Sequence, residues 1–561
     1  MYLRRYGWLA PVAWEKMPTE PAITSTFDRE RLTLPEILEG GETSRTFKWK
    51  HRHLQTTVST KTTEQPKIRE DLLPALQRFQ QANSIPATGR LDSETLSFLN
   101  SPRCGVPDHL LGLTAREEDE KEDGNIATNE EEEINTNVLQ AAERKRTKRA
   151  ILGHRSGGQV VFGRRPLRWR LIGEGYSSQL SIGEQRQVLK LAFRMWSEVA
   201  PVEFQEDLVS PPAFVDIKLG FGTGRHLGCV RTFDGFGHEF AHAWRLGDVH
   251  FDDDENFSLP NSPRGINLLK VAVHEIGHVL GLQHVMTRNS VMQPRYLPHN
   301  GAFELDAVDR KHVQHMYGIC NSPFDTIFDW VRSERQPDGR PVIFFNTYIF
   351  RNSWYWMYEN RKGRPRHGDP LPISAGWPGL PISQIDGFAH VWMGSQDCTY
   401  FFKGAYYWRY DNSRDQVYSV DPEGVTYPRL IPEEFPGVPY PIDTVYFDHE
   451  DRHLYFFKEN NVTAFDIYKR RPVFGHPIPL VSLFLPVRPG DHPFGGLDAA
   501  YYSYSLGSLF LLKNSQVWQV VPSRQHPAGT VTPHRDLLPG RSVSDTWKDV
   551  CDVHISMLNM A

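Results

Sequence analysis

The spacing of apolar residues predicts two short helices near the start of the chain. Within 72–100, one set of residues recurs at the spacing of a helix face: Leu72, Leu73, Leu76, Phe79 and Gln80. Pro86 and Gly89 then mark a turn, and Asp92 is placed to cap a second helix. A small helical unit is therefore expected ahead of the loop 102–108.

The middle of the chain, residues 150–319, mixes the periods of strands and helices. Apolar and polar residues alternate in LRWRLI (167–172) and FVDIKLGF (214–221), which predicts strands. In GEQRQVLKLAFRMWSEVA (183–200) the apolar residues recur at helical spacing. We therefore expect an α+β domain in this part of the chain.

Beyond residue 320 the pattern changes to aromatic segments that repeat. Units that begin with an apolar residue and an aspartate start at residues 324, 385, 442 and 497, and a second aromatic segment follows each. Four such units predict a four-bladed β-propeller, whereas an open sandwich does not explain the repeated start. Cys320 and Cys551 bracket the units, so a disulfide between them would tie the first blade to the last.

Two charged segments separate the helical unit from the α+β domain. Residues 116–133 are acidic, have no hydrophobic pattern and are predicted to be disordered. The basic sequence RKRTKR (144–149), with Arg146, Lys148 and Arg149, has two interpretations. It is a nuclear-localisation or heparin-binding patch or, in a secreted chain, a furin-type cleavage site. We favour cleavage because an exposed linker is accessible to a protease.

The composition is that of a soluble protein with several domains. The chain has 561 residues, 39% of them hydrophobic, and a formal net charge of −5, which gives no reason to expect a nucleic-acid partner. No apolar run approaches the roughly 18 residues of a membrane span. The sequons at Asn256 and Asn461 have meaning only in a secreted chain. Because the five cysteines are odd in number, at least one lacks an intramolecular disulfide partner.

The strongest chemical signal is VAVHEIGHVLGLQH (271–284). His274 and His278 are four residues apart, so they project from one face of a helix toward a common point. Gly281 permits a turn out of the helix, and His284 then supplies a third nitrogen. Three neutral imidazoles leave the fourth zinc position open, as a catalytic site requires. Glu275 is placed to accept a proton from the zinc-bound water and to pass it to the leaving amine.

Two further features bear on this metal site. Met292 in SVMQPRY would form a hydrophobic turn beneath the zinc, which disfavours the alternative of a buried helix with satisfied histidines. Upstream, residues 224–255 hold candidate ligands for a closed structural zinc: His226, His242 and His250. The same segment holds oxygen ligands suited to calcium: Asp234, Asp252 and Glu255. A solvated acidic loop would explain the carboxylates but not the histidines.

These motifs occur in a recognisable order. PRCGVPD (102–108), the basic site, the histidine motif with its methionine turn and the four repeats together resemble the secreted matrix metalloproteinases with a haemopexin-like domain. The resemblance covers nearly the whole chain. It implies four parts: a helical prodomain (1–149), an α+β metzincin catalytic domain (150–319), a four-bladed haemopexin-like propeller (320–551) and a C-terminal tail (552–561).

The resemblance also assigns a role to the lone cysteine of PRCGVPD. A thiol in a stiff loop can be a disulfide partner, a nucleophile or a metal ligand. The resemblance implies the third role, in which Cys104 is the fourth ligand of the catalytic zinc in a latent proenzyme. Arg103 and Asp108 would pair to hold the loop, and cleavage after Arg149 would remove the thiol.

The family implies a secreted enzyme that cleaves extracellular proteins. Its expected partners are these substrates, a furin-like convertase and tissue inhibitors of metalloproteinases, and its expected cofactors are zinc and calcium. YLRRYGWLAP (2–11) resembles the first prodomain helix, which in the family follows a signal peptide. We infer that this sequence is truncated or mis-started. The alternative function is a mainly non-catalytic extracellular binding protein that acts through its propeller.

Some positions depart from the family pattern at the metal sites. Cys229 stands where an aspartate usually binds the structural zinc, so we predict that it is a ligand; the alternative is a buried free thiol. Asp216 and Asp248 match the carboxylates of a second calcium site. The glycine-rich loop that completes that site is largely missing, which argues against bound calcium there.

Other departures bear on activity. Val308 replaces one of two aspartates that receive the new N-terminal ammonium after activation, and only Asp309 remains. Lys270 replaces an apolar residue at the base of the specificity pocket, so it would shorten the pocket or favour an acidic group. Cys398 has no evident partner, and we expect a free thiol rather than an intermolecular disulfide.

Overall fold

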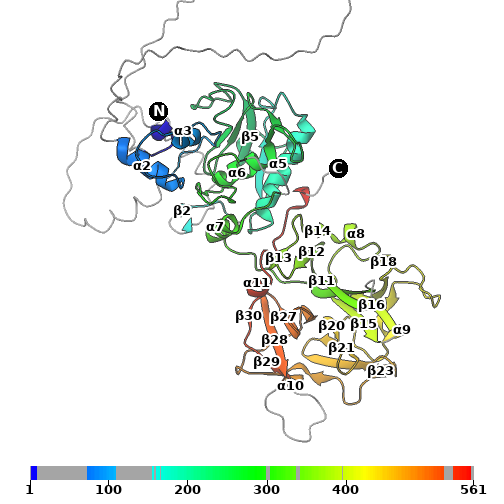
Figure 1. Cartoon of the computed structure of the whole chain (residues 1–561). Helices are drawn as coiled ribbons and strands as arrows, with labels where there is room; N and C mark the ends of the chain where they lie inside the picture. Colours follow the sequence, from blue (N-terminus) through cyan, green and yellow to red (C-terminus); the bar gives the residue numbers. More distant parts are fainter. Residues whose placement is uncertain are drawn as a thin grey trace, which may run out of the picture. The chain divides into compact units, whose positions relative to one another are not determined.

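The computed structural model describes most of the chain outside the charged segments (Figure 1). The described residues are 2–8, 72–108, 155–156, 159–163, 166–297, 303–335, 341–393, 396–522 and 535–557. The acidic segment 116–133 and the basic site with Arg146, Lys148 and Arg149 lie outside them. The described residues fall into two compact units. Ser101–Val106, which contain Cys104 and are called the switch segment below, belong to the second unit together with the described residues from Arg155 onward.

The first unit is the predicted helical one. It contains α1 (Tyr2–Arg5), α2 (Leu72–Ala82) and α3 (Ser93–Leu99). Asp92 caps α3 as predicted, because its side chain accepts a hydrogen bond from the amide of Thr95 at 2.8 Å. Phe79 is buried and makes edge-to-face contacts with Tyr2 and Trp8. Within the predicted apolar face, Leu73 is 42% exposed.

The α+β domain is built on one twisted sheet with strand order β4-β3-β5-β7-β6. In that order the strands span Phe204–Glu206, Leu167–Leu171, Ile217–Gly222, Val249–Asp252 and Ala241–Ala243. All neighbouring pairs are parallel except the last, so β6 is an antiparallel edge strand. Short elements of the same domain are β1 (Arg155–Ser156), β2 (Gln159–Val160), η2 (Pro212–Phe214), β8 (Phe257–Ser258) and β9 (Ile266–Asn267).

Helices α5 (Ile182–Ser197) and α6 (Leu268–Val279) supply most of the remaining core of this domain, and α7 (Ala307–Tyr317) follows them. A capping box between Ser181 and Glu184 fixes the start of α5. Every residue of α6 is buried except Lys270. The indole of Trp196 donates a hydrogen bond to the carbonyl of Val273, which fastens α5 to α6 at 3.0 Å.

The predicted four-bladed propeller is confirmed (Figure 1). The first two blades contain β10 (Thr326–Arg335), β11 (Pro341–Arg351), β12 (Trp354–Glu359), β13 (Arg364–Pro365) and β14 (Leu371–Pro372), then β15 (Gly387–Met393), β16 (Gln396–Lys403), β17 (Tyr406–Asp411), β18 (Gln416–Val417) and β19 (Arg429–Leu430). The third contains β20 (Thr444–Phe447), β21 (His453–Lys458), β22 (Asn461–Asp466), β23 (Arg471–Pro472) and β24 (Ile478–Pro479). The fourth contains β25 (Phe484–Pro486), β26 (Ala499–Ser503), β27 (Ser508–Lys513), β28 (Gln516–Pro522), β29 (Arg535–Leu537) and β30 (Arg541–Ser542). One short helix accompanies each blade: α8 (Ile373–Gly376), α9 (Ile431–Glu434), α10 (Leu480–Leu483) and α11 (Val543–Thr546).

The aspartate that begins each repeat has the same structural role in every blade. The four aspartates, in chain order, are Asp325, Asp386, Asp443 and Asp498. Each accepts a hydrogen bond from a backbone amide in one turn of its blade, between β11 and β12, β16 and β17, β21 and β22, or β27 and β28. The donors are the amides of Asn352, Gly404, Glu459 and Asn514. These turn residues all have positive φ, between 53° and 60°. The aspartate therefore holds a strained tight turn, which explains why it recurs.

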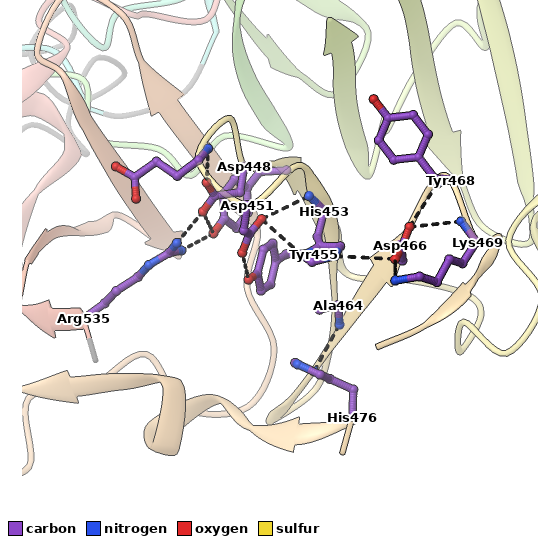
Figure 2. A network of polar contacts seen from close by, with 12 residues as sticks. Asp448, Asp451, His453, Tyr455, Ala464, Asp466, Tyr468, Lys469, His476 and Arg535 are labelled. Atoms are coloured by element: carbon purple, nitrogen blue, oxygen red, sulfur yellow. Dashed lines mark hydrogen bonds and ion pairs between the residues drawn. The ribbon is translucent and has the colours of Figure 1, made fainter. Parts of the chain in front are cut away.

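The propeller closes through covalent and polar contacts. Cys320 and Cys551 form a disulfide, with their Cα atoms 5.2 Å apart. Figure 2 shows an ion pair between the third and fourth blades, in which Arg535 of β29 points at Asp448, just after β20. Asp448 is buried and Arg535 is half-buried. The same guanidinium donates to the hydroxyl of Tyr446 at 2.5 Å.

The described residues after Cys551, 552–557, pack against the α+β domain. Val553 is 3% exposed and Met557, in η3 (Ile555–Met557), is fully buried. Both join the hydrophobic core of the α+β domain, where η3 contacts β4 and α5. The described part of the tail therefore completes the core of a domain that is distant in the sequence.

Candidate metal centres

The three histidines of the predicted catalytic motif converge on one point. His274 and His278 project from α6, and Gly281, with a φ of 101°, turns the chain so that His284 returns. The Nε2 atoms of the three rings lie 3.0 to 3.3 Å apart. Ligand nitrogens about 2.1 Å from a tetrahedral zinc are about 3.4 Å from one another. The rings therefore fit a zinc ion.

Hydrogen bonds on the far side of the rings fix their orientation. Nδ1 of His274 donates to the carbonyl of Val291 at 2.7 Å, and Nδ1 of His278 donates to that of Leu282 at 2.9 Å. Each ring is thus the tautomer whose Nε2 carries a lone pair toward the point where the rings converge. Burial, and then the neighbouring His284, lower the pKa of His274 to about 3, so its imidazole is neutral, as a metal ligand must be.

The methionine turn lies directly under α6. Met292 is fully buried, and a Cβ on Gly277 would come within 2.4 Å of its sulfur. Only glycine lets the turn approach the helix this closely. The carboxylate of Asp309 accepts hydrogen bonds from the Ser290 hydroxyl at 2.5 Å and the Val291 amide at 2.8 Å, which fastens the turn to α7. Asp309 itself is fully buried.

Cys104 completes the histidine cluster. Its sulfur and one nitrogen of each of the three histidines all lie within 4.8 Å of one another. The amide of Val106 donates to this sulfur at 3.2 Å. Burial raises the pKa of Glu275 to about 8, and its Oε2 has no hydrogen-bond partner. A zinc ion at the histidines would oppose that shift, because a nearby cation stabilises the carboxylate.

The switch segment lies as an extra strand between two parts of the α+β domain. On one side, the amides of Arg103 and Gly105 donate to the carbonyls of His238 and Ala241, each at 2.8 Å, and the amide of Phe240 donates back to Arg103 at 3.1 Å. On the other side, residues 102 and 104 pair with 296 and 294 at 2.9 and 2.8 Å. Five backbone hydrogen bonds therefore hold residues 102–105.

The side chains of Arg103 and Asp108 each make hydrogen bonds of their own. Arg103 is 2% exposed and donates to the carbonyls of Cys104 at 3.0 Å and Val106 at 3.4 Å. Asp108 accepts a hydrogen bond from the indole of Trp8 at 2.8 Å. The pairing of Arg103 with Asp108 stays a prediction.

Lys270 lies at a cavity next to the histidines. The cavity, about 390 Å³ with its solvent-open part, is also lined by Cys104, Glu275 and Tyr296. The ammonium of Lys270 donates to the carbonyl of Leu297 at 2.5 Å and lies 5.4 Å from the Tyr296 ring centre. Burial lowers the pKa of Lys270. The lysine side chain therefore lines the cavity and is held by a backbone carbonyl and an aromatic ring; its role in the specificity pocket stays a prediction.

A second cluster of ligand atoms contains Cys229 and the three upstream histidines. One ligand atom each from His226, Cys229, His242 and His250 lies within 4.8 Å of the others. Nε2 of His226 is 3.1 Å from Nδ1 of His250, and the sulfur of Cys229 is 3.5 Å from Nε2 of His242. Three imidazoles and one cysteine sulfur at these distances could hold a tetrahedral zinc ion.

Sequence reasoning missed one buried residue beside this cluster, Glu239. Oε1 of Glu239 lies 2.7 Å from Nδ1 of His242, and both side chains are fully buried. The signal was present, because HEFAH (238–242) repeats the H-E-x-x-H pattern of the catalytic motif. Residues 238–240 come before the edge strand β6 and form no helix, so the pattern does not bring both histidines to one metal: His242 is buried in the cluster and His238 is exposed.

The predicted calcium carboxylates lie close enough to interact, but they do not form a third tight cluster. Burial raises the pKa of Asp252 to about 7, and Asp254, Glu255 and Asp234 add to the rise. Oδ2 of Asp252 is buried without a hydrogen-bond partner. A carboxylate in this state is stabilised by a cation.

The second calcium position has a different source of positive charge. The ammonium of Lys218 lies 3.2 and 3.3 Å from the two oxygens of Asp248. Asp216 accepts a hydrogen bond from the amide of Arg168 at 2.9 Å. The ion pair of Lys218 with Asp248 and the missing glycine-rich loop both argue against calcium at this position.

The remaining predicted residues lie at the surface or outside the clusters. Asn256 and Asn461 are both exposed, as glycosylation acceptors must be. Cys398 is a half-buried free thiol, and Arg409 donates to its sulfur at 3.5 Å.

Comparison with known proteins gives consistent matches. Residues 162–318 match the Matrixin family, and residues 346–381 and 394–440 match the Hemopexin family. The chain is 46% identical to Matrix metalloproteinase-21 of Cynops pyrrhogaster, covering 100% of this chain and 91% of that protein. It is 50% identical to Matrix metalloproteinase-21 of Homo sapiens, covering 87% and 85%. Macrophage metalloelastase of Oryctolagus cuniculus is 26% identical, covering 71% and 85%.

Proposed function

The chain belongs to the matrix metalloproteinase family and is a zinc-dependent endopeptidase, and from this premise we propose that it is a secreted, latent zymogen. Cys104 is the fourth ligand of the catalytic zinc, and cleavage after Arg149 by a furin-like convertase removes it. The processed enzyme hydrolyses extracellular proteins and is a target for tissue inhibitors of metalloproteinases. Among the described residues, no helix is long and apolar enough to cross a membrane.

One observation carries the proposal of latency. The Cys104 sulfur faces the same point as the three histidines, while residues 102–105 fill the cleft as a strand. A thiolate at the fourth zinc position excludes the water that hydrolysis needs, and a paired strand excludes an extended peptide. Latency therefore has two components, the sulfur and the strand.

Once the segment is gone, the residues of the site act on the substrate directly. A bound zinc ion supplies a Lewis acid and lowers the pKa of a coordinated water toward about 7. Glu275, buried beside His274, accepts the proton of the attacking water and returns it to the leaving amine. The edge strand β6 and residues 294–296, freed from the segment, offer their backbone groups to an extended substrate.

The second cluster supports a structural zinc held by His226, Cys229, His242 and His250. This set has no open position, so its role is to stabilise the fold. Calcium at Asp234, Asp252 and Glu255 would have the same role. Replacing Cys229 with serine should reduce the tightly held zinc from two ions to one, as counted by elemental analysis. Two tightly held zinc ions in Cys229→Ser would refute the thiolate ligand.

The enzyme proposal is tested with processed protein and a quenched generic peptide. Processed wild type should cleave the peptide and processed Glu275→Ala should not, although both retain zinc. If neither cleaves while both hold zinc, the enzyme function fails, and a binding protein that acts through the propeller becomes the better interpretation.

Latency is tested in an Arg149→Ala background that a convertase cannot cut. This parent should be inactive, and adding Cys104→Ala should give measurable cleavage that stays below the processed level, because the strand remains in place. Full activity of the Arg149→Ala parent would refute latency.

A further inference from the structure

Glu239 is buried in an unusual position behind a ring of the second cluster. Its side chain and that of His242 are both fully buried, and Oε1 accepts from Nδ1 of His242 at 2.7 Å. The corresponding partners of other cluster histidines are neutral carbonyls, those of Gly224, Val291 and Leu282. Burying a carboxylate is unfavourable unless strong interactions offset the loss of water, so its presence here needs a reason.

The geometry excludes Glu239 as a direct ligand of the cluster. The converging ligand atoms come from His226, Cys229, His242 and His250, and the group does not include Glu239. Its oxygen faces the nitrogen of His242 that points away from the Cys229 sulfur, since Nε2 is the atom 3.5 Å from that sulfur. The order carboxylate, imidazole, metal position is the arrangement in which an outer carboxylate fixes a ligand ring.

The backbone and neighbours of Glu239 prevent its side chain from moving. Its amide donates to Oδ1 of Asp234 at 3.2 Å, and its backbone forms a parallel bridge with Arg103. On the other side, a Cβ built on Gly105 would lie 2.0 Å from Oε1, so the switch segment packs against the carboxylate. The carboxylate is therefore fixed between a metal-ligand ring and the segment that closes the cleft.

We propose that Glu239 is the positioning residue of the structural zinc centre, which it stabilises by holding the His242 ring as an Nε2 ligand. The proposal rests on the structural zinc of the proposed function. Glu239 accepts a hydrogen bond from Nδ1–H of His242, which fixes the tautomer and ring angle and makes the imidazole a stronger electron donor. A metal ion on the other side of the ring in turn stabilises the buried carboxylate.

The test measures zinc retention in the full chain with Arg149→Ala, so that the segment stays in place. Wild type at Glu239 should hold two zinc ions through dialysis against a graded series of chelator concentrations. Glu239→Ala should weaken one of the two by about 10- to 100-fold, as removal of an outer-shell partner does, and leave the other unchanged. Glu239→Gln keeps the shape of the side chain and an acceptor oxygen but loses the charge, so its zinc affinity should fall less than that of Glu239→Ala.

A control and a second readout separate positioning from general damage. Glu198→Gln also removes a largely buried carboxylate, which pairs with Arg194 at 2.8 Å. This pair does not belong to either cluster, so the variant should retain both zinc ions. Cobalt replaces zinc in a Cys104→Ala background, where a thiolate-to-cobalt absorption band reports Cys229 alone. This band should shift or weaken in Glu239→Gln.

The outcomes distinguish the two proposals. A parent protein that holds one zinc ion removes the structural centre itself, before any change at Glu239. A parent with two zinc ions whose Glu239→Ala and Glu239→Gln variants keep the same chelator midpoint and the same cobalt band overturns the role of Glu239 alone.

Discussion

Replacement of Gly105 by alanine tests how the zymogen is closed. An added Cβ would lie 2.0 Å from Oε1 and 2.3 Å from Cδ of Glu239, whereas real Cβ contacts below 3.0 Å essentially never occur. The carboxylate is fully buried, and moving it aside would break its hydrogen bond to His242, so we expect the segment to shift instead. The switch segment must therefore retreat by about 1 Å, which overstretches a hydrogen bond such as that from Gly105 to Ala241, 2.8 Å long.

The size of the effect follows from the cost of overpacking. Inserting one methyl group into a tightly packed site costs about 1–3 kcal/mol. Because about 1.4 kcal/mol changes an equilibrium tenfold, the open form of the zymogen should become about 5- to 150-fold more populated. The increase should appear both in access to the Cys104 thiol and in peptide cleavage by the uncut protein.

The assay uses Arg149→Ala protein, so that processing does not contribute. Alkylation of Cys104 is followed by mass spectrometry, which separates it from the other two free thiols, and cleavage of a quenched peptide is followed in parallel. Gly183→Ala is the matched control, because a Cβ there meets nothing within 4 Å. Equal alkylation rates in Gly105→Ala, Gly183→Ala and the parent would refute the reasoning.

Three further changes probe other parts of the molecule. Met557→Ala should cost about 2–5 kcal/mol of unfolding free energy by leaving a cavity in the α+β core. The side chain of Ile555 is 67% exposed, so Ile555→Ala should leave the thermal midpoint unchanged. Equal midpoints for the two variants would contradict the packing of the tail. Lys270→Leu should broaden the acceptance of bulky residues just after the cut, and an unchanged peptide-library profile would argue against a role for the lysine in the pocket. Arg535→Ala should cost about 3–5 kcal/mol, because it leaves a buried carboxylate unpaired. Arg332→Ala removes an exposed pair and should cost at most about 1 kcal/mol; similar denaturation midpoints for the two arginine variants would contradict this difference.

The catalytic cluster was predictable because its ligands are local in the sequence. A helix places residues four apart on one face, so His274 and His278 were certain to converge once the segment formed a helix. A glycine with positive φ then brought back His284, only six residues further on. The haemopexin repeat was predictable for a similar reason, since the aspartate and the turn that it holds belong to the same blade.

The second cluster was only partly predictable. Its histidines were found by residue type, but HEFAH carried the same letters as the catalytic motif without the helix that would give them the same meaning. The partner of Asp248 was also missed, because Lys218 reaches it across two paired strands, β5 and β7. Neither contact follows from local spacing.

The sequence by itself determined the residue types, the helix that carries the catalytic ligands, the four blades and the cysteine in its stiff loop. The tertiary structure decided which carboxylate lies behind His242, which strands the switch segment joins and where Met557 is buried. The physical reason is that periodicity fixes the direction of side chains within one element. Contacts between elements distant in the sequence depend instead on how their surfaces pack, and no local pattern encodes that packing.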